Sequence, residues 1–187
     1  MKKLIVLPVI ILSLFIVACS SDDAKKVLVS VMTDGKKFVS KTNISKSDLN
    51  KYVREISGIT VKNWDLISFT KSNDYVRFLD DLYIKIGDKP LHPKLKRRIE
   101  LYIENIERSA RNTDTRLFER GGKFPGEHAE VRALNELLHQ IDPGNKISVE
   151  IFKNIFGVNR NIDSGKDMAR CFHCSSITDL ITILFVN

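Results

Sequence analysis

The chain has 187 residues, of which 43% are hydrophobic and 28% charged, and its formal net charge is +7 at pH 7. This composition is ordinary for one globular domain, and it excludes a collagen-like chain, a disordered polyelectrolyte and a membrane protein with many spans. The mildly basic charge permits partners that carry phosphate without requiring them. Three cysteines are too few for a disulfide scaffold.

The first 18 residues have the pattern of a secretory signal. Two lysines precede an apolar run over residues 4–17, which is shorter than the roughly 20 residues of a membrane-spanning helix. The run ends in the sequence IVAC (residues 16–19), which resembles the bacterial lipobox, where the cysteine carries the lipid. The alternative is an uncleaved anchor with an incidental cysteine. We expect a signal peptide over residues 1–18 and lipidation of Cys19.

Residues 19–26 are predicted to form a polar tether after the lipid. Its first residues, CSSDD (19–23), resemble the surface-export signal of some bacterial lipoproteins. Several acyl chains on Cys19 would hold the mature chain to a membrane. The sequence therefore predicts a membrane-anchored bacterial lipoprotein of the outer membrane, with the rest of the chain exposed at the cell surface.

Hydrophobic spacing and turn residues predict the elements that follow. The expected strands cover residues 27–31, 37–40, 147–151 and 181–186. The first two strands form a hairpin with an Asp-Gly turn at residues 34–35. The expected helices cover residues 45–56, 74–86, 93–111, 127–141 and 175–180. The stretch that contains Gly157 and Asn159 is expected to be a loop.

The order of helix, strand, helix and strand in the C-terminal half predicts an α/β or α+β domain, with helices on a small sheet. The helix expected over residues 93–111 also carries a row of basic side chains. They are Lys94, Lys96, Arg97, Arg98 and Arg108. Such a row is typical of a solvated helix face, and contact with nucleic acid is the alternative.

Two short segments carry candidate zinc ligands. His128 and Glu130 open one expected helix, and Cys171 and Cys174 lie at the start of another. Zinc prefers nitrogen and sulfur ligands, and a catalytic zinc site keeps three protein ligands and one open position. The exposed amides of a helix start favour thiolates. Side chains two residues apart on a helix diverge by roughly 200°, so His128 and Glu130 can act together only in the first turn.

These segments resemble the His-x-Glu and Cys-x-x-Cys signature of zinc-dependent nucleobase deaminases. The sequences of two segments, GEHAEVRALNEL (126–137) and MARCFHCSSITD (168–179), are most similar to those of the YwqJ-like deaminases of bacterial polymorphic toxins. The resemblance covers roughly residues 112–187. The wider superfamily has proline before the first cysteine, where this sequence has Arg170.

The resemblance implies a three-layer α/β/α, cytidine deaminase-like sandwich over residues 91–187. The region upstream of it in the sequence, residues 27–90, is expected to be mainly helical and to have an unknown role. It implies that His128, Cys171 and Cys174 bind Zn²⁺ and that Glu130 transfers protons during hydrolytic deamination of a nucleobase. The substrate would be a nucleoside, nucleotide or nucleic acid. A toxin or effector role is implied too, with an immunity protein as a further partner.

Three side chains are candidates for substrate binding. A planar base can stack on aromatic rings, which makes Phe124 and Phe172 candidate walls of a slot, although we expect ordinary packing for each. Arg120 could hold a phosphate, or it could be a solvated loop charge. His173 could be a fourth ligand, but we expect it to face away from the two cysteines.

Two other functions fit the same residues. A zinc-stabilised binding module without catalysis would use the same ligands, although structural zinc sites usually close with four protein ligands. A thiol–disulfide protein is suggested by Cys-x-x-Cys in an exported chain. We expect it less, because a thioredoxin-like fold needs strands and a helix after this motif and 13 residues follow Cys174.

Overall fold

The computed structural model describes residues 28–55, 60–62, 66–69, 71–109, 116–119 and 124–184. The predicted signal peptide, Cys19, the tether and Arg120 lie outside these residues. No helix in the described part of the chain is long and apolar enough to cross a membrane.

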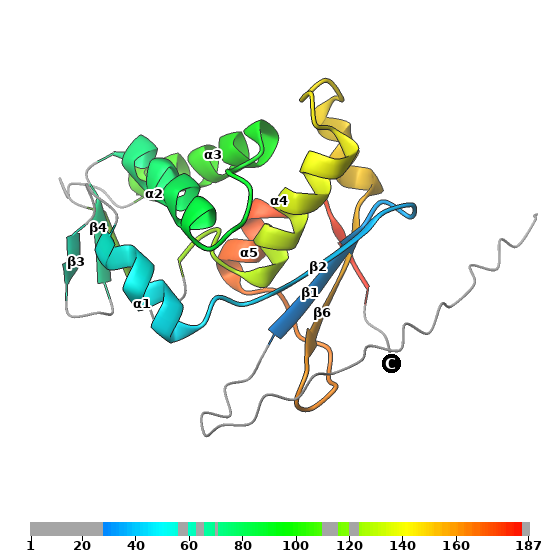
Figure 1. The fold of residues 1–187 in the computed structure, drawn as a ribbon. Coiled ribbons are helices and arrows are strands. Elements are labelled where there is room, and N and C mark those ends of the chain that lie inside the picture. The colour runs from blue at the N-terminus through cyan, green and yellow to red at the C-terminus, as the bar shows by residue number, and fades with distance from the viewer. Residues whose placement is uncertain are drawn as a thin grey trace, which may run out of the picture.

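The main sheet has four strands in the order β2-β1-β6-β7 (Figure 1). The strands are β1 (Leu28–Thr33), β2 (Phe38–Thr42), β6 (Phe156–Asn161) and β7 (Thr182–Ile183). β1 pairs antiparallel with both β2 and β6, and β6 pairs parallel with β7. The hairpin predicted upstream is therefore present, and it supplies two of the four strands of this sheet. A second, antiparallel sheet has the order β3-β4-β5, with strands Thr60–Lys62, Leu66–Phe69 and Arg116–Glu119.

The helices that position the site lie on one side of the main sheet (Figure 1). Their bounds are α2 (Ser72–Lys85), α3 (Pro93–Ser109), α4 (Ala129–Ile141) and α5 (Phe172–Ile177); α1 spans Lys46–Glu55. The helices predicted over residues 45–56, 74–86, 93–111 and 127–141 are confirmed. The α/β class is confirmed as well.

Helix α4 lies at the centre of the fold. It packs against β1 and β2 on one side and contacts α5. Its apolar residues Val131, Leu134, Leu137 and Leu138 are all completely buried, and so are the inward residues Leu95, Ile99 and Ile103 of α3. A helix buried on nearly all sides packs against several neighbours at once, so the first turn of α4 starts deep inside the domain.

Two predicted elements are wrong in the segment between α4 and α5. Residues 147–151 alternate like a strand, but Val149–Asn154 form the 3₁₀ helix η2, because Ser148 caps it by accepting a hydrogen bond from the Glu150 amide. The strand follows at β6, in the stretch predicted to be a loop. The helix predicted over residues 175–180 begins earlier, at Phe172, with Cys171 as its N-cap.

Candidate metal centre and active site

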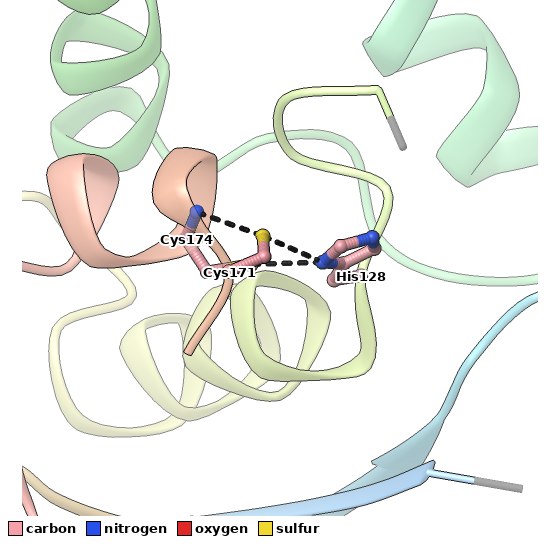
Figure 2. Close-up of side chains that lie close together, drawn as sticks. All are labelled: His128, Cys171 and Cys174. Atoms are coloured by element: carbon pink, nitrogen blue, oxygen red, sulfur yellow. Dashed lines mark hydrogen bonds between the residues drawn. The ribbon is translucent and has the colours of Figure 1, made fainter. Parts of the chain in front are cut away.

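Two helix starts bring the predicted zinc ligands together (Figure 2). His128 immediately precedes α4 and has an extended backbone, with φ −72° and ψ 154°. Cys171 holds the equivalent position before α5, with φ −69° and ψ 164°, and Cys174 lies in the first turn of α5. Because α4 and α5 contact each other, residues 43 positions apart in the sequence meet in space.

The three ligand atoms form a compact group. The Nδ1 atom of His128 lies 3.0 Å from the Cys174 sulfur and 3.3 Å from the Cys171 sulfur. All three ligand atoms are within 4.8 Å of one another. His128 and Cys174 are buried, and Cys171 is half-buried. Cys171 and Cys174 are not joined in a disulfide.

The surroundings of Cys171 favour its thiolate form. The hydrogen bond with the Cys174 side chain, followed by those with His128 and the Cys174 amide, lowers the pKa of Cys171 to about 3, although burial acts in the opposite direction. The Cys174 amide donates to the Cys171 sulfur over 3.3 Å, as an N-cap contact. Since the thiolate is the form that binds metal, Cys171 is prepared to act as a ligand.

The donor set fits zinc. Zinc bonds of about 2.3 Å to sulfur and about 2.0–2.1 Å to nitrogen, in a tetrahedral arrangement, place a sulfur and a nitrogen ligand about 3.5 Å apart. The separations of 3.0 and 3.3 Å are close to this value. Three protein ligands with one open position are typical of catalytic rather than structural sites. His128, Cys171 and Cys174 would therefore hold the ion and leave room for a water or substrate atom.

Glu130 is the buried carboxylate of the site, with 2% of its surface exposed. Both of its oxygens accept hydrogen bonds, Oε1 from the Thr178 hydroxyl at 2.7 Å and Oε2 from the Asn159 amide at 2.9 Å. Burial raises the pKa of Glu130, although Thr178, Asn159 and the charge of Arg170 act against it. A raised pKa brings a carboxyl group closer to the range in which it can both accept and donate a proton.

The structure shows how His128 and Glu130 can act together although they are only two residues apart. In an intact helix the two side chains would point in nearly opposite directions. His128 precedes the first helical residue and Glu130 is the second residue of α4, so the imidazole is free of the helical spacing. The imidazole can therefore turn to the sulfurs, while the Glu130 carboxylate turns to Thr178 and Asn159.

Arg170, which replaces the proline of the wider superfamily, fixes the segment around α5. Its Nη1 atom donates to the Thr178 carbonyl oxygen at 2.6 Å and contacts the Thr178 hydroxyl at 3.0 Å. Its Nε atom lies 3.9 Å from the Oε1 atom of Glu130. Arg170, directly before Cys171, is thus linked to Thr178, directly after α5. Proline has no side-chain donor and could not make this link.

The loop before His128 is held from behind by two buried tyrosines of α2. The Tyr75 hydroxyl donates to the Pro125 carbonyl oxygen at 2.8 Å, and the Tyr83 hydroxyl donates to that of Gly126 at 2.6 Å. Gly126 has φ +95°, and a Cβ atom there would lie 2.8 Å from a methyl group of Leu79. Only glycine fits this backbone without strain. Gly126 and the two tyrosines therefore fix the backbone position from which the His128 side chain extends.

The candidate substrate-binding residues have different positions. Phe124 is 2% exposed and packs edge-on against Phe78, with ring centroids 6.4 Å apart, so it belongs to the core. Phe172 is 74% exposed and lies 6.4 Å from the Tyr102 ring. Ordinary packing therefore describes Phe124, while Phe172 remains an exposed aromatic side chain beside the two ligand cysteines.

Among the described residues, the group of potential metal ligands does not include His173. Its Nδ1 atom lies 2.6 Å from the Tyr102 hydroxyl. A cavity of about 110 Å³ is lined by His128 of this group together with Glu127, Asn43 and Ile44. The Nε2 atom of His128 is buried and has no hydrogen-bond partner in the described part of the chain. His128 is thus both a member of the ligand group and a lining residue of the cavity.

Asn159, Thr178 and Ser30 were not identified from the sequence. Asn159 sits in a stretch with no apolar periodicity, and Ser30 belongs to a hairpin far upstream. Thr178 follows the Cys-x-x-Cys motif by four residues, but threonine has no spacing rule that marks such a role. A polar residue at an inward strand position was the one available signal, and it becomes visible only when the strand is known.

An α/β domain with two helix starts converging on a His-Cys-Cys group, beside a buried glutamate, has the architecture of a deaminase. The YwqJ-like deaminase family model matches residues 72–183, which is more than half of the chain. The chain therefore belongs to the YwqJ-like deaminase family. Searches of curated proteins and of solved structures found no match.

Proposed function

We propose that this protein is a zinc-dependent hydrolytic deaminase that acts on a nucleobase. The observation that carries the proposal is the convergence of His128, Cys171 and Cys174 within 4.8 Å, beside the buried carboxylate of Glu130. The family supports a deaminase, and the nitrogen and sulfur donors support zinc as the metal.

The proposed reaction replaces an exocyclic amino group by oxygen. Zinc, when bound, supplies a Lewis acid that makes hydroxide available near neutral pH. Glu130 accepts a proton from the attacking water and delivers it to the ring nitrogen, and it then takes the second proton from the new carbon-bound hydroxyl group and delivers it to the departing amine. A carbon–oxygen bond forms, the carbon–nitrogen bond breaks and ammonia leaves, so no oxidant or reductant is needed.

Thr178 and Asn159 would keep the Glu130 carboxylate in place through both proton transfers. Each carboxylate oxygen carries two lone pairs, so each oxygen that accepts one hydrogen bond from the protein retains a second acceptor position for the water or the base. Burial of Glu130 excludes bulk water and strengthens these interactions. Phe172 is the aromatic side chain best exposed for stacking on a base near the cysteines.

Replacement of Glu130 by glutamine tests the proposal. The purified protein, loaded with zinc, should release ammonia from at least one member of a panel of nucleosides, nucleotides, single-stranded DNA and RNA. Glu130→Gln should lower kcat by at least about 100-fold, because glutamine cannot accept the proton, while zinc content measured by atomic absorption stays unchanged. Glu136→Gln, on the same helix but paired with Lys89, is the matched control and should keep full activity.

A protein that binds zinc but releases no ammonia from any member of the panel would be the non-catalytic binding module instead. The thiol–disulfide alternative predicts reversible oxidation of Cys171 and Cys174, with zinc dispensable for function.

We also propose that the deaminase is delivered as a lipoprotein, anchored through Cys19 in the outer membrane and exposed at the cell surface. The lipobox-like sequence at residues 16–19 supports this proposal. A toxin or effector role, with an immunity protein as partner, is supported by the resemblance to polymorphic-toxin domains. Neither the lipid anchor nor the toxin role changes the reaction proposed at Glu130.

A further inference from the structure

A chain of buried polar side chains runs from the first strand of the sheet to Glu130. The Ser30 hydroxyl on β1 donates to the Oδ1 atom of Asn159 on β6, and the Nδ2 atom of Asn159 donates to Glu130 at 2.9 Å. None of the three residues is more than 2% exposed. Ser30 and Asn159 are direct partners in the β1–β6 register, so the pairing of the two strands sets this contact.

The direction of these hydrogen bonds is set by Glu130, and Ser30 satisfies the other end of the Asn159 amide. An amide side chain has an acceptor end and a donor end, whereas an ionised carboxylate only accepts. The donor end of Asn159 therefore faces Glu130, and the Ser30 hydroxyl, which can donate or accept, donates to the acceptor end. If the amide were turned over, its oxygen would face the acceptor-only carboxylate and the hydrogen bond would be lost.

The second oxygen of the carboxylate is held from a different part of the fold. Thr178, which follows α5, donates to Oε1 at 2.7 Å, and Arg170 in turn contacts Thr178. A carboxylate held at one oxygen can rotate about its last bond. A carboxylate held at both oxygens in a buried site can rotate only by breaking a hydrogen bond, which leaves a buried polar group without a partner.

We propose that Ser30 and Asn159 are positioning residues that orient the Glu130 carboxylate, with Ser30 acting through Asn159. The inference rests on the proposed function, because Glu130 is the proton carrier of that reaction. It extends the active site to β1, which lies outside residues 72–183 that match the family model. The strands thus contribute to the chemistry as well as to the fold.

Two substitutions at Asn159 separate positioning from packing. Asn159→Asp keeps the shape but replaces the donor by a carboxylate that faces Glu130, whereas Asn159→Ala removes the group. A positioning role predicts that kcat falls about 10- to 100-fold in Asn159→Ala and further in Asn159→Asp, with KM within about twofold of the wild type. A packing role predicts the reverse order, because aspartate fills the space and alanine does not.

Asn161→Ala is the matched control, since Asn161 lies on the same strand and face but accepts hydrogen bonds from Ser164. It should lose stability without losing kcat once folded and loaded with zinc. Zinc content and the midpoint of thermal unfolding are measured for every variant. Equal kcat in Asn159→Asp and the wild type, or equal losses in Asn159→Ala and Asn161→Ala, would overturn the proposal.

Ser30 is tested by a double-mutant cycle. Ser30→Ala should lower kcat less than Asn159→Ala does, and the double variant should be no worse than Asn159→Ala alone, because Ser30 acts through Asn159. Ser40→Ala, at an exposed position of the same hairpin, should leave kcat unchanged. Additive losses from Ser30→Ala and Asn159→Ala would contradict the proposed order of contacts.

A measurement without turnover separates this inference from the proposed function. In the ¹⁵N-labelled protein, the side-chain NH₂ signals of Asn159 are identified by their loss in Asn159→Asp. These signals should shift in both Ser30→Ala and Glu130→Ala and stay in place in Ser40→Ala. If they shift but the wild type releases no ammonia, the contacts stand and the enzymatic proposal fails. If neither variant shifts them, the positioning proposal fails even when the enzyme is active.

Discussion

Cys174 belongs both to the ligand group and to the hydrophobic core. Its side chain is 2% exposed and packs within the main cluster of buried apolar residues, yet its sulfur lies 3.0 Å from the His128 nitrogen. Buried polar or charged groups lower stability unless they are paired. A metal ion that pairs with these groups should therefore stabilise the fold, as well as serving the reaction.

Removal of zinc should lower the stability of the wild-type protein. A ligand present at about 1,000 times its Kd stabilises the folded state by about 4 kcal/mol, so chelation should lower the midpoint of thermal unfolding by several degrees. Cys174→Ala should bind little or no zinc, and its midpoint should not respond to the chelator. Ser175→Ala, on the same helix, serves as the control and should respond like the wild type. An unchanged wild-type midpoint after complete zinc removal would argue against a metal at this site.

At the scale of single residues, the sequence predicts those candidate functional positions that follow a spacing rule. His128, Glu130, Cys171 and Cys174 could be named because zinc chemistry needs these residue types at short, fixed separations. Ser30 and Asn159 are 129 residues apart, and their contact depends on the register of two strands. Such a register cannot be obtained from one sequence in which the second strand is not recognised.

Among the secondary-structure elements, β6 shows why a strand can be hidden from sequence reasoning. Its inward residues are Gly157, Asn159 and Asn161, which give no apolar alternation. A Cβ atom on Gly157 would lie 2.7 Å from Ile183 and 2.8 Å from Met32, and the two asparagines bind Glu130 and the Ser164 turn. The local pattern fails where close packing and the candidate active site replace the usual apolar side chains.

The segment before β6 shows the converse, because a strand is predicted over residues 147–151 and the structure has the 3₁₀ helix η2 there. Residues 147–151 alternate between apolar and polar side chains, but Ile147 and Val149 are 46% and 59% exposed, so the alternation does not correspond to a buried face. The cap at Ser148 begins η2 instead. Short alternating runs are ambiguous in this way, because periodicity alone does not show which face is buried.

The basic row of α3 is paired within the protein. Lys94 contacts Asp142, Lys96 contacts Asp80, Arg97 contacts Glu100, Arg98 contacts Asp179 and Arg108 contacts Glu104. Arg98 also lies 4.8 Å from the Phe152 ring centre. Because each charge already has an acidic partner, this helix face offers less net positive charge to a nucleic acid than the sequence suggests.

A buried ion pair connects β2, the end of α2 and α4. Asp88 accepts hydrogen bonds from Lys41 and Arg132, both at 2.6 Å. Burial alone would raise the pKa of Asp88, but the hydrogen bonds from Arg132 and Lys41 outweigh it and lower the pKa. A carboxylate with a lowered pKa in the folded state stabilises the protein above its unfolded pKa of about 3.9 and loses that contribution as the pH falls through the folded value.

Asp88→Asn should therefore destabilise the protein at pH 7 by an amount that shrinks below about pH 4. The free energy of unfolding of both proteins, measured by denaturant titration from pH 7 to pH 3, gives this difference directly. Asp74→Asn, whose partner Arg77 is largely exposed, should cost little at any pH. A difference between Asp88→Asn and wild type that stays constant over the whole range would contradict the pKa shift.

For the whole molecule, the main sheet joins the two ends of the described chain. β1 begins at Leu28 and pairs with β6, whose other neighbour β7 ends at Ile183. The boundary expected between residues 90 and 91 falls between α2 and α3, which pack on each other. The α/β class and the helices could be predicted, since they follow from local periodicity. The sharing of one sheet by distant segments could not, because it depends on pairing between strands.

The proposed lipidation of Cys19 gives a prediction for the full chain in a bacterial host. The wild-type protein should incorporate an alkyne analogue of palmitate and fractionate with membranes, and Cys19→Ser should do neither. Cys171→Ser, which alters the metal group alone, should still be labelled. Labelling of Cys19→Ser to the wild-type level would place the lipid elsewhere.

The central position of β1 has a consequence for the order of synthesis. β1 leaves the ribosome long before β6 and α5, and until those segments follow, Glu130 lacks Asn159 and His128 lacks both sulfurs. A nascent chain that still lacks β6 and α5 therefore has neither the His-Cys-Cys group nor the contact between Asn159 and Glu130. If the finished protein is harmful to the cell that makes it, this late assembly keeps every unfinished copy inert.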